Sequence, residues 1–266
     1  MKRIIRKTVY FLILYVLVPA AATSTENGSG SREANEYAKS IETAYFNAKE
    51  LEEAGYNAAA LEAYAECVEL FKEASQEYGS DIEELSGYAA ESAFEIAEAN
   101  FENYDRIRLV MPPKTLETNL SKRLELSKRL VDYYRYCVDL DVPEWTVAAE
   151  VRMGDVNYSF AEALCNAEPP PEIAPEKWIY LRPGDDDRIL LEDMHRNYVH
   201  SLEEQAFPLY DQARAFYADA LKTAGANNIN DEWTRRAAEM SEEAEERSRI
   251  IRAGVFERRE FESGDL

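Results

Sequence analysis

Apolar side chains recur every three or four residues over most of this chain, which is the period of an amphipathic α-helix. The first such stretch covers residues 32–54, and its apolar stripe consists of Tyr37, Ile41, Tyr45, Ala48 and Leu51. Further stretches begin near residue 57 and cover about 80–109, 114–139, 143–166, 188–223 and 231–258. A strand-length alternation of apolar and polar residues is not found, so the pattern predicts an all-α fold.

Glycine and proline divide this pattern into separate helices. Gly55 ends the first stretch and the next begins almost at once, which predicts a helix hairpin with a very short turn. A Pro-Pro pair at 112–113 breaks the chain, and residues 168–187 hold five prolines and are expected to form a loop. Pro208 lies inside a helical stretch and is expected to kink or break it near Phe207.

One short motif occurs twice, first as EWTVAAE and later as EWTRRAAE. Each copy follows a loop, so each is expected to open a helix. Trp145 and Trp233 then lie in first turns, where an indole ring can cover the open end of a hairpin core. Asp141 and Asn230 precede the two motifs and are the expected N-caps.

The segment AGYNAAALEAYAECVEL resembles the centre of a tetratricopeptide repeat. Ala60, Tyr64 and Cys67 match the small, aromatic and small positions through which hairpins of that family pack on one another. The resemblance implies a tetratricopeptide-like α-solenoid of antiparallel helix hairpins. Residues 124–245 also resemble the C-terminal region of large exported tetratricopeptide repeat proteins of Gram-negative bacteria, in EWTVAAEVRMGDVNYSFAEAL, LEEQAFPLYDQARAFYADAL and DEWTRRAAEM. That resemblance implies a scaffold facing the cell envelope.

The N-terminus has the layout of a secretory signal peptide. Four basic residues precede the apolar run from Thr8 to Val18, and three alanines ending at Ala22 offer a cleavage site. Residues 1–22 are therefore the predicted signal peptide, and 23–31 a flexible, Ser- and Gly-rich leader. The predicted location is the periplasm or another exported compartment. The alternative is an uncleaved leader that anchors the chain, which is the only expected contact with a membrane.

Charge and cysteine content narrow the function classes. Asp and Glu number 52 against 30 Lys and Arg, a net charge of −22, and such a chain repels nucleic acid. The simplest interpretation of the acidity is a solvated helical surface.

Cys137 and Cys165 lie near the ends of successive helices, at opposite poles of a hairpin, so no disulfide is expected between them. With Cys67 they are expected to be small buried apolar residues.

Few residues suggest chemistry. Glu192 and His195 are one helical turn apart, the spacing found in di-iron bundles, but the second Glu-x-x-His of such a site is absent. The run GDDDR at 184–188 offers oxygen ligands for calcium, although capping of the next helix, for which Asp187 is the candidate, explains it more simply. No catalytic residue, metal site or cofactor is predicted, and a catalytic triad or phosphate-binding loop is not found.

The 17 tyrosines suggest a surface for a protein partner. Candidate partner-binding residues are Tyr133, Tyr134, Tyr136 and Tyr158, together with Trp178 in the proline-rich loop. The predicted organisation is an N-terminal hairpin region over 32–110 and a C-terminal repeat region over 114–258. The leading hypothesis is an exported, non-enzymatic protein-interaction scaffold. The alternative is a metal-binding helical protein or enzyme that uses Glu192 and His195.

Overall fold

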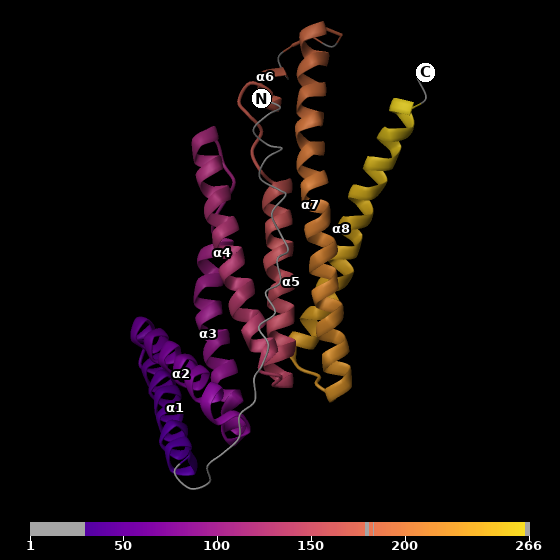
Figure 1. Cartoon of the computed structure of the whole chain (residues 1–266). Coiled ribbons are helices and arrows are strands. Elements are labelled where there is room, and N and C mark those ends of the chain that lie inside the picture. Colours follow the sequence, from indigo (N-terminus) through magenta and orange to yellow (C-terminus); the bar gives the residue numbers. More distant parts are fainter. Residues whose placement is uncertain (1–29, 179–180, 183, 264–266) are drawn as a thin grey trace.

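The structure is a computed structural model that describes residues 30–178, 181–182 and 184–263. It is an array of helices joined mostly by short connections (Figure 1). In chain order these are α1 (Gly30–Glu53), α2 (Asn57–Tyr78), the 3₁₀-helix η2 (Gly79–Leu85), α3 (Ser86–Asp105), α4 (Pro113–Asp139), α5 (Pro143–Cys165), α6 (Pro175–Trp178), α7 (Asp186–Asn227) and α8 (Glu232–Ser263). Among the described residues there is no strand.

Successive helices pack as antiparallel hairpins, α1 with α2, α3 with α4, and α5 with α7. The second helix of each hairpin also packs on the first helix of the next unit, and α7 packs in this way on α8. The first helices touch one another as well, α1 with α3, α3 with α5, and α5 with α8. These four helices run in the same direction (Figure 1) and form one face of the array, called the groove face below. The predicted all-α stack of antiparallel helix hairpins is confirmed.

The first hairpin is built as its sequence predicts. Gly55 has a φ of +79°, which lets the chain reverse between α1 and α2 without a Cβ clash. Ala60, Tyr64 and Cys67 of α2 are all at most 2% exposed, and the Tyr64 hydroxyl donates to Glu52 Oε2 at 2.9 Å. These three side chains therefore lie in the buried core of the array.

The most extensive contact in the array is between α5 and α7. It uses a stripe of α7 on which alanine and tyrosine alternate, at Ala206, Tyr210, Ala213, Tyr217 and Ala220. Every one of these side chains is at most 1% exposed. The alanines let the two helix backbones approach, and the tyrosine rings fill the space between them.

The third predicted helix starts differently from the expectation. Residues 79–85 form η2 rather than the first turns of α3, and α3 ends at Asp105 instead of near Leu109. Ile82 and Leu85 are both buried, and their spacing of three residues matches the period of a 3₁₀-helix. Gly79, the first residue of η2, has a φ of +53° and ends α2.

Of the kink or break expected at Pro208, the break is wrong, because α7 continues through it as one helix of 42 residues, whereas the kink stays a prediction. Proline removes one N–H from the helix and crowds the preceding turn, at a cost of about 3 kcal/mol. Here Ala206 and Tyr210 on either side are buried against the hairpin, and this packing keeps the chain helical.

The expected N-caps are also wrong. Asp141 has a φ of +53° and turns the chain after α4, so Val142 takes the N-cap position of α5. Before α8 the capping side chain is Asp231 rather than Asn230, because Asp231 Oδ1 accepts from the Thr234 N–H at 2.9 Å. Asp187 lies within the first turn of α7, two residues after Asp185, which takes the N-cap position.

The predicted signal peptide, 1–22, and the leader up to residue 29 lie outside the described residues, and Gly30 already belongs to α1. In the described part of the chain, none of the helices combines the length and the apolar character needed to cross a membrane. All three cysteines are free, so the expected absence of a Cys137–Cys165 bridge is confirmed. Cys67 and Cys137 are buried as predicted, whereas Cys165 is only half-buried.

Candidate functional site

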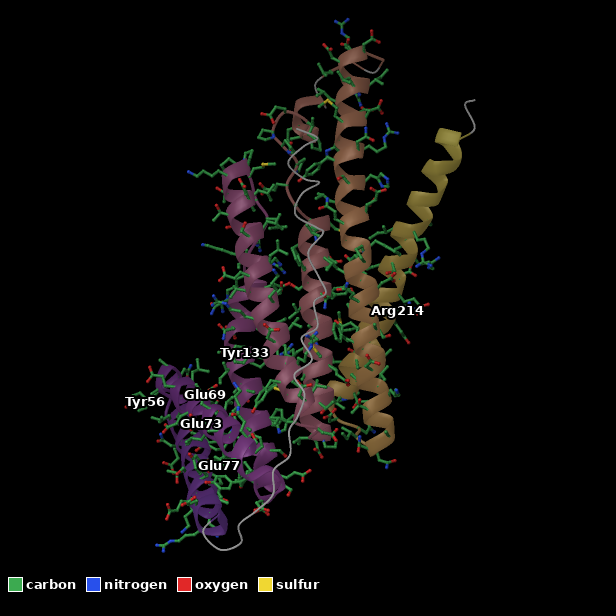
Figure 2. All side chains as sticks on the ribbon, in the orientation of Figure 1. Tyr56, Glu69, Glu73, Glu77, Tyr133 and Arg214 are labelled. Carbon is green, nitrogen blue, oxygen red and sulfur yellow. The ribbon has the colours of Figure 1, made fainter. Side chains whose placement is uncertain are left out.

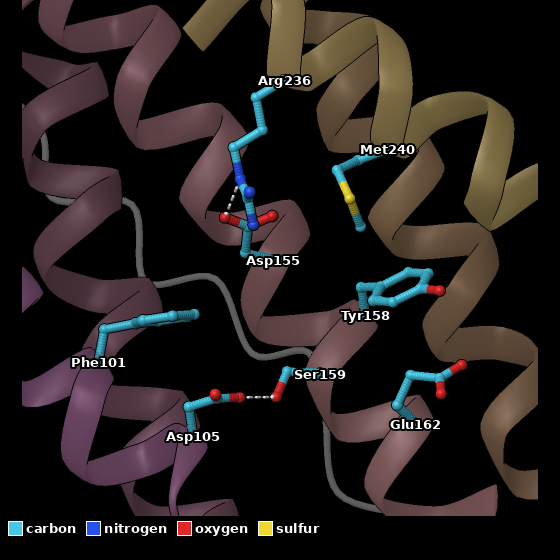
Figure 3. Close-up of a pocket in the computed structure, with 8 residues that line it drawn as sticks. All are labelled: Phe101, Asp105, Asp155, Tyr158, Ser159, Glu162, Arg236 and Met240. Carbon is cyan, nitrogen blue, oxygen red and sulfur yellow. Dashed lines mark hydrogen bonds and ion pairs between the residues drawn. The ribbon is translucent and has the colours of Figure 1, made fainter. Parts of the chain in front are cut away.

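A cleft of about 290 Å³ opens on the groove face between α3, α5 and α8 (Figure 3). Eight residues line it: Phe101 and Asp105 of α3, Asp155, Tyr158, Ser159 and Glu162 of α5, and Arg236 and Met240 of α8. Figure 3 shows the two α3 side chains facing those of α5 and α8 across the open space. Small-molecule pockets usually hold about 300–1,000 Å³, so this volume suits a single side chain of a partner.

Beside the cleft, Arg152 of α5 is enclosed by acidic and aromatic groups. Its Nε donates to Glu98 Oε1 at 2.8 Å, its Nη2 donates to the other oxygen of Glu98, and its Nη1 donates to Asp155 Oδ2 at 2.9 Å. Its Cζ lies 4.9 Å from the ring centroid of Phe101 and 4.8 Å from that of Trp233. Burial opposes the charge of Arg152, but the hydrogen bonds and charge of Glu98 outweigh burial and raise its pKa. The guanidinium is therefore both charged and fixed.

Two tyrosines from the antiparallel helices complete this network. Tyr134 of α4 donates to Glu98 Oε1 at 2.6 Å, and Tyr217 of α7 donates to Asp155 Oδ1 at 2.9 Å. Burial, followed by the charge of the neighbouring carboxylate, raises the pKa of both phenols, so both remain protonated donors. Arg236 of α8 also donates to Asp155, from Nε to Oδ2 at 2.9 Å. Asp155 is only 3% exposed and is held by three helices.

The α3 wall of the cleft is supported from behind. The Ser159 hydroxyl donates to Asp105 Oδ1 at 2.5 Å and accepts from Arg123 Nη2 at 2.5 Å. Arg123 comes from α4, is 2% exposed, donates to the Ile107 carbonyl and lies 4.4 Å from the ring centroid of Tyr104. It steadies Ser159 and Asp105 without lining the cleft itself.

The wall formed by α5 is held by α7 and α8. Glu162 Oε1 accepts from the Tyr210 hydroxyl at 2.5 Å and pairs with Arg247 Nε at 3.3 Å. The Tyr158 hydroxyl donates to Glu243 Oε1 at 2.6 Å. Three carboxylates and one guanidinium line the cleft, so its lining favours a cation over an anion.

The tryptophans of the two EWT motifs, Trp145 and Trp233, pack on the same side chain. Trp145 is the third residue of α5 and Trp233 the second residue of α8, so both lie in first turns as expected. Their rings pack on Phe94 of α3, with centroid distances of 5.2 Å and 5.5 Å. The repeated motif therefore brings the first turns of α5 and α8 to the same side chain of α3.

The tyrosines proposed from the sequence do not share one surface. Tyr133 is 36% exposed on α4 (Figure 2), Tyr134 is buried in the ion network, and Tyr136 lies under Lys72, whose Nζ is 4.8 Å from its ring centroid. Tyr158 alone of these four lines the cleft. The side chain of Trp178, the fifth candidate, lies outside the described part of the chain.

Glu192, one of the residues considered for metal chemistry, is paired within its own helix. Glu192 Oε1 accepts from Arg188 Nε at 2.7 Å, one turn away on α7. The carboxylates of the 184–188 run are exposed at the start of the same helix. Among the described residues, no group of three or more His, Cys, Asp or Glu side chains is arranged to hold a metal ion.

The sequence analysis did not identify Asp105 and Glu162, because acidic residues are too common in this chain for any one to stand out, and Ser159 carried no signal of its own. Asp155 carried a usable signal, since it is the single charged residue in an otherwise apolar and small stretch, MGDV, of a buried helix. A buried charge of this kind needs a partner and often marks an organised site.

Comparison with known proteins does not place the chain in a family. No protein-family model and no curated protein matches it. Among solved structures, a de novo designed helical repeat protein is similar, with 14% identity over 85% of this chain and 97% of that chain, at a TM-score of 0.19. The assignment of the fold rests on the helix packing of this chain itself.

Proposed function

We propose that this protein is an exported, non-enzymatic scaffold of the tetratricopeptide-repeat type, whose groove face binds an extended segment of a partner protein. The observation that carries the proposal is the cleft between α3, α5 and α8. Its walls are held by hydrogen bonds from helices behind them, so little ordering would be needed when a partner binds.

The architecture supports the same function. Stacked helix hairpins expose one continuous face to which each successive unit contributes a helix, and such faces suit extended peptides. Export is proposed from the N-terminal sequence pattern. Determination of the N-terminal residue of the mature protein tests it, and Thr23 is the expected result.

Selection of displayed random 12-residue peptides on the purified mature chain tests the binding function. Selected peptides are expected to bind less tightly to a Met240→Trp variant, in which a large ring fills the cleft. A Tyr56→Ala variant is the matched control, because Tyr56 is 66% exposed in the α1–α2 turn, away from the cleft (Figure 2). The proposal fails if the selection enriches no binder, or if all enriched peptides bind both variants equally.

A further inference from the structure

The cleft is the second of two layers of side chains that are related by a shift of seven residues along four helices, α3, α5, α7 and α8. In the first layer the residues are Phe94, Glu98, Arg152, Asp155, Trp233 and Tyr217. In the second layer they are Phe101, Asp105, Ser159, Glu162, Met240 and Tyr210. Seven residues are nearly two helical turns, a rise of about 10.5 Å.

The shift is consistent in direction as well as in length. The groove-face helices α3, α5 and α8 are parallel, so each moves seven residues forward, whereas α7 is antiparallel and moves seven back, from Tyr217 to Tyr210. The contacts repeat too. Tyr217 donates to Asp155 in the first layer, and Tyr210 donates to Glu162 in the second. The second layer therefore repeats the tyrosine–carboxylate contact of the first at equivalent positions.

The two layers differ at the position that carries the cation. The first layer is filled by Arg152, between the carboxylates of Glu98 and Asp155. The second layer has the short side chain of Ser159 at that position, together with a cleft of about 290 Å³. The acidic pair contributed by α3 and α5 is retained, as Asp105 and Glu162.

The geometry points to a basic partner: the cleft receives an arginine side chain from the bound segment, between Asp105 and Glu162, in the manner of Arg152 one layer away. This inference rests on the proposed function and names the chemistry of its ligand. Met240 takes the place of Trp233 as a thioether wall for the guanidinium, and Phe101, whose ring also packs on Arg152 at 4.9 Å, lines the cleft beside it. A guanidinium can bind carboxylates in a fork geometry and is desolvated more easily than an ammonium, which favours arginine over lysine.

The cations already present near the second layer leave this space open. Arg123 reaches Ser159 from α4, behind the wall, and Arg247 approaches Glu162 from the rim with its side chain 48% exposed. Neither residue lines the cleft. Arg236 does line it, but its Nε is committed to Asp155.

The test uses Nα-acetyl-arginine amide and its neutral isostere Nα-acetyl-citrulline amide as probes, titrated into the full mature chain and followed by backbone amide NMR. The arginine probe is expected to shift signals at the lining residues of α3, α5 and α8. Its dissociation constant is expected to be about tenfold or more below that of the citrulline probe, since one charge-assisted hydrogen bond accounts for about that factor.

Two variants locate the binding. Asp105→Asn combined with Glu162→Gln is expected to remove the preference for arginine, whereas Glu102→Gln combined with Glu239→Gln, two exposed acids adjacent in sequence to the lining residues Phe101 and Met240, is expected to keep it. Ser159→Arg places a guanidinium of the chain itself at the position equivalent to Arg152. This variant is expected to abolish binding of the arginine probe. The dissociation constants of the two probes on the unaltered chain test the inference even where a variant fails to fold.

Equal binding of the two probes, or shifts spread over the acidic surface, overturns the inference. Its failure can be told apart from failure of the proposed function. If selected peptides bind the groove face but show no need for arginine, the scaffold function survives and the basic ligand does not. If no peptide is selected, the proposed function fails whatever the arginine probe does.

Discussion

A Cβ atom on Gly154 would lie 2.7 Å from Cδ1 and Cζ of Tyr217, and closer still to Cε1. The ring cannot move aside easily, because Tyr217 is fully buried and its hydroxyl is bonded to Asp155. The absence of a side chain at residue 154 therefore sets how closely α5 and α7 approach.

Gly154→Ala is accordingly expected to destabilise the protein by about 1–3 kcal/mol, the usual cost of overpacking a core. Gly225→Ala is the matched control, since Gly225 is also helical, on α7, but a Cβ added there would have no heavy atom within 4 Å. It is expected to be neutral or to stabilise by up to about 1 kcal/mol. Urea unfolding followed by circular dichroism measures both, and equal stability of the two variants would contradict the packing argument.

Asp155→Ala is expected to cost about 3–5 kcal/mol. The change leaves Arg152 with one carboxylate instead of two and removes the acceptor of Tyr217, and breaking a buried ion pair has costs of this size. Asp193→Ala is the control, because Asp193 forms an exposed pair with Arg196 one turn away. Its effect is expected to stay below about 0.5 kcal/mol. A small loss of stability for Asp155→Ala would show that the network does not hold the hairpins together.

The helices could be predicted because their signal is local. The 3.6-residue period and the punctuation by Gly55 and the Pro-Pro pair fix where helices lie, whatever packs on them. The errors arose where tertiary contacts decide. Pro208 stays helical because its flanking residues are buried against another hairpin, and Asp141 turns the chain instead of capping it. Neither outcome can be read from a single helix.

The candidate site was predictable only in part. Tyr158 was proposed from the sequence and lines the cleft, whereas Tyr134, on an equally regular stripe, is buried. Periodicity shows that a side chain belongs to a stripe, but the packing of hairpins decides which stripe faces the groove. The seven-residue relation between Arg152 and Ser159 is present in the sequence. Its significance is recognisable only in the folded structure, where the neighbouring helices place both positions on the same face.

Phe94→Ala is expected to cost about 3–5 kcal/mol, because its buried ring packs on both Trp145 and Trp233. Tryptophan emission is also expected to move to longer wavelength as water reaches the two indoles. Tyr56→Ala provides the control, since Tyr56 is 66% exposed in the α1–α2 turn, and its effect is expected to be within about 0.5 kcal/mol. An unchanged emission wavelength in Phe94→Ala would show that the Phe94 ring does not shield the two indoles from water.

Glu95 is expected to make stability depend on pH. Burial, followed by the charge of Glu52, raises the pKa of Glu95 to about 7, with Glu91 and Glu98 adding to the effect and Lys49 opposing it. An unfolded glutamate titrates near pH 4.3, so the folded state binds more protons between there and about pH 7. Stability contributed by the protonated form is present at low pH and is lost as the pH rises through 7.

Glu95→Gln should remove this dependence. The variant is expected to be as stable as the parent near pH 4 and more stable above pH 7, with a flatter pH profile between. Glu73→Gln, on the exposed side of α2 (Figure 2), is expected to leave the profile unchanged. Chemical unfolding at a series of pH values measures the profiles. If the free energy of unfolding depends on pH in the same way in the parent and in Glu95→Gln, groups other than Glu95 cause the pH dependence.

Pro208→Ala is expected to stabilise the protein, because α7 runs through this position as a helix and alanine restores the N–H that proline lacks. A gain of about 1–3 kcal/mol is expected, less than the full cost of an internal proline, since the surrounding packing already accommodates the ring. Pro143→Ala is the matched control. Pro143 is the first residue of α5, where its fixed φ suits the helix and its missing N–H leaves no bond unmade, so no gain is expected there. If Pro208→Ala instead destabilises the chain in urea unfolding, the proline shapes α7 to fit α5 and α8, and its ring is part of that fit.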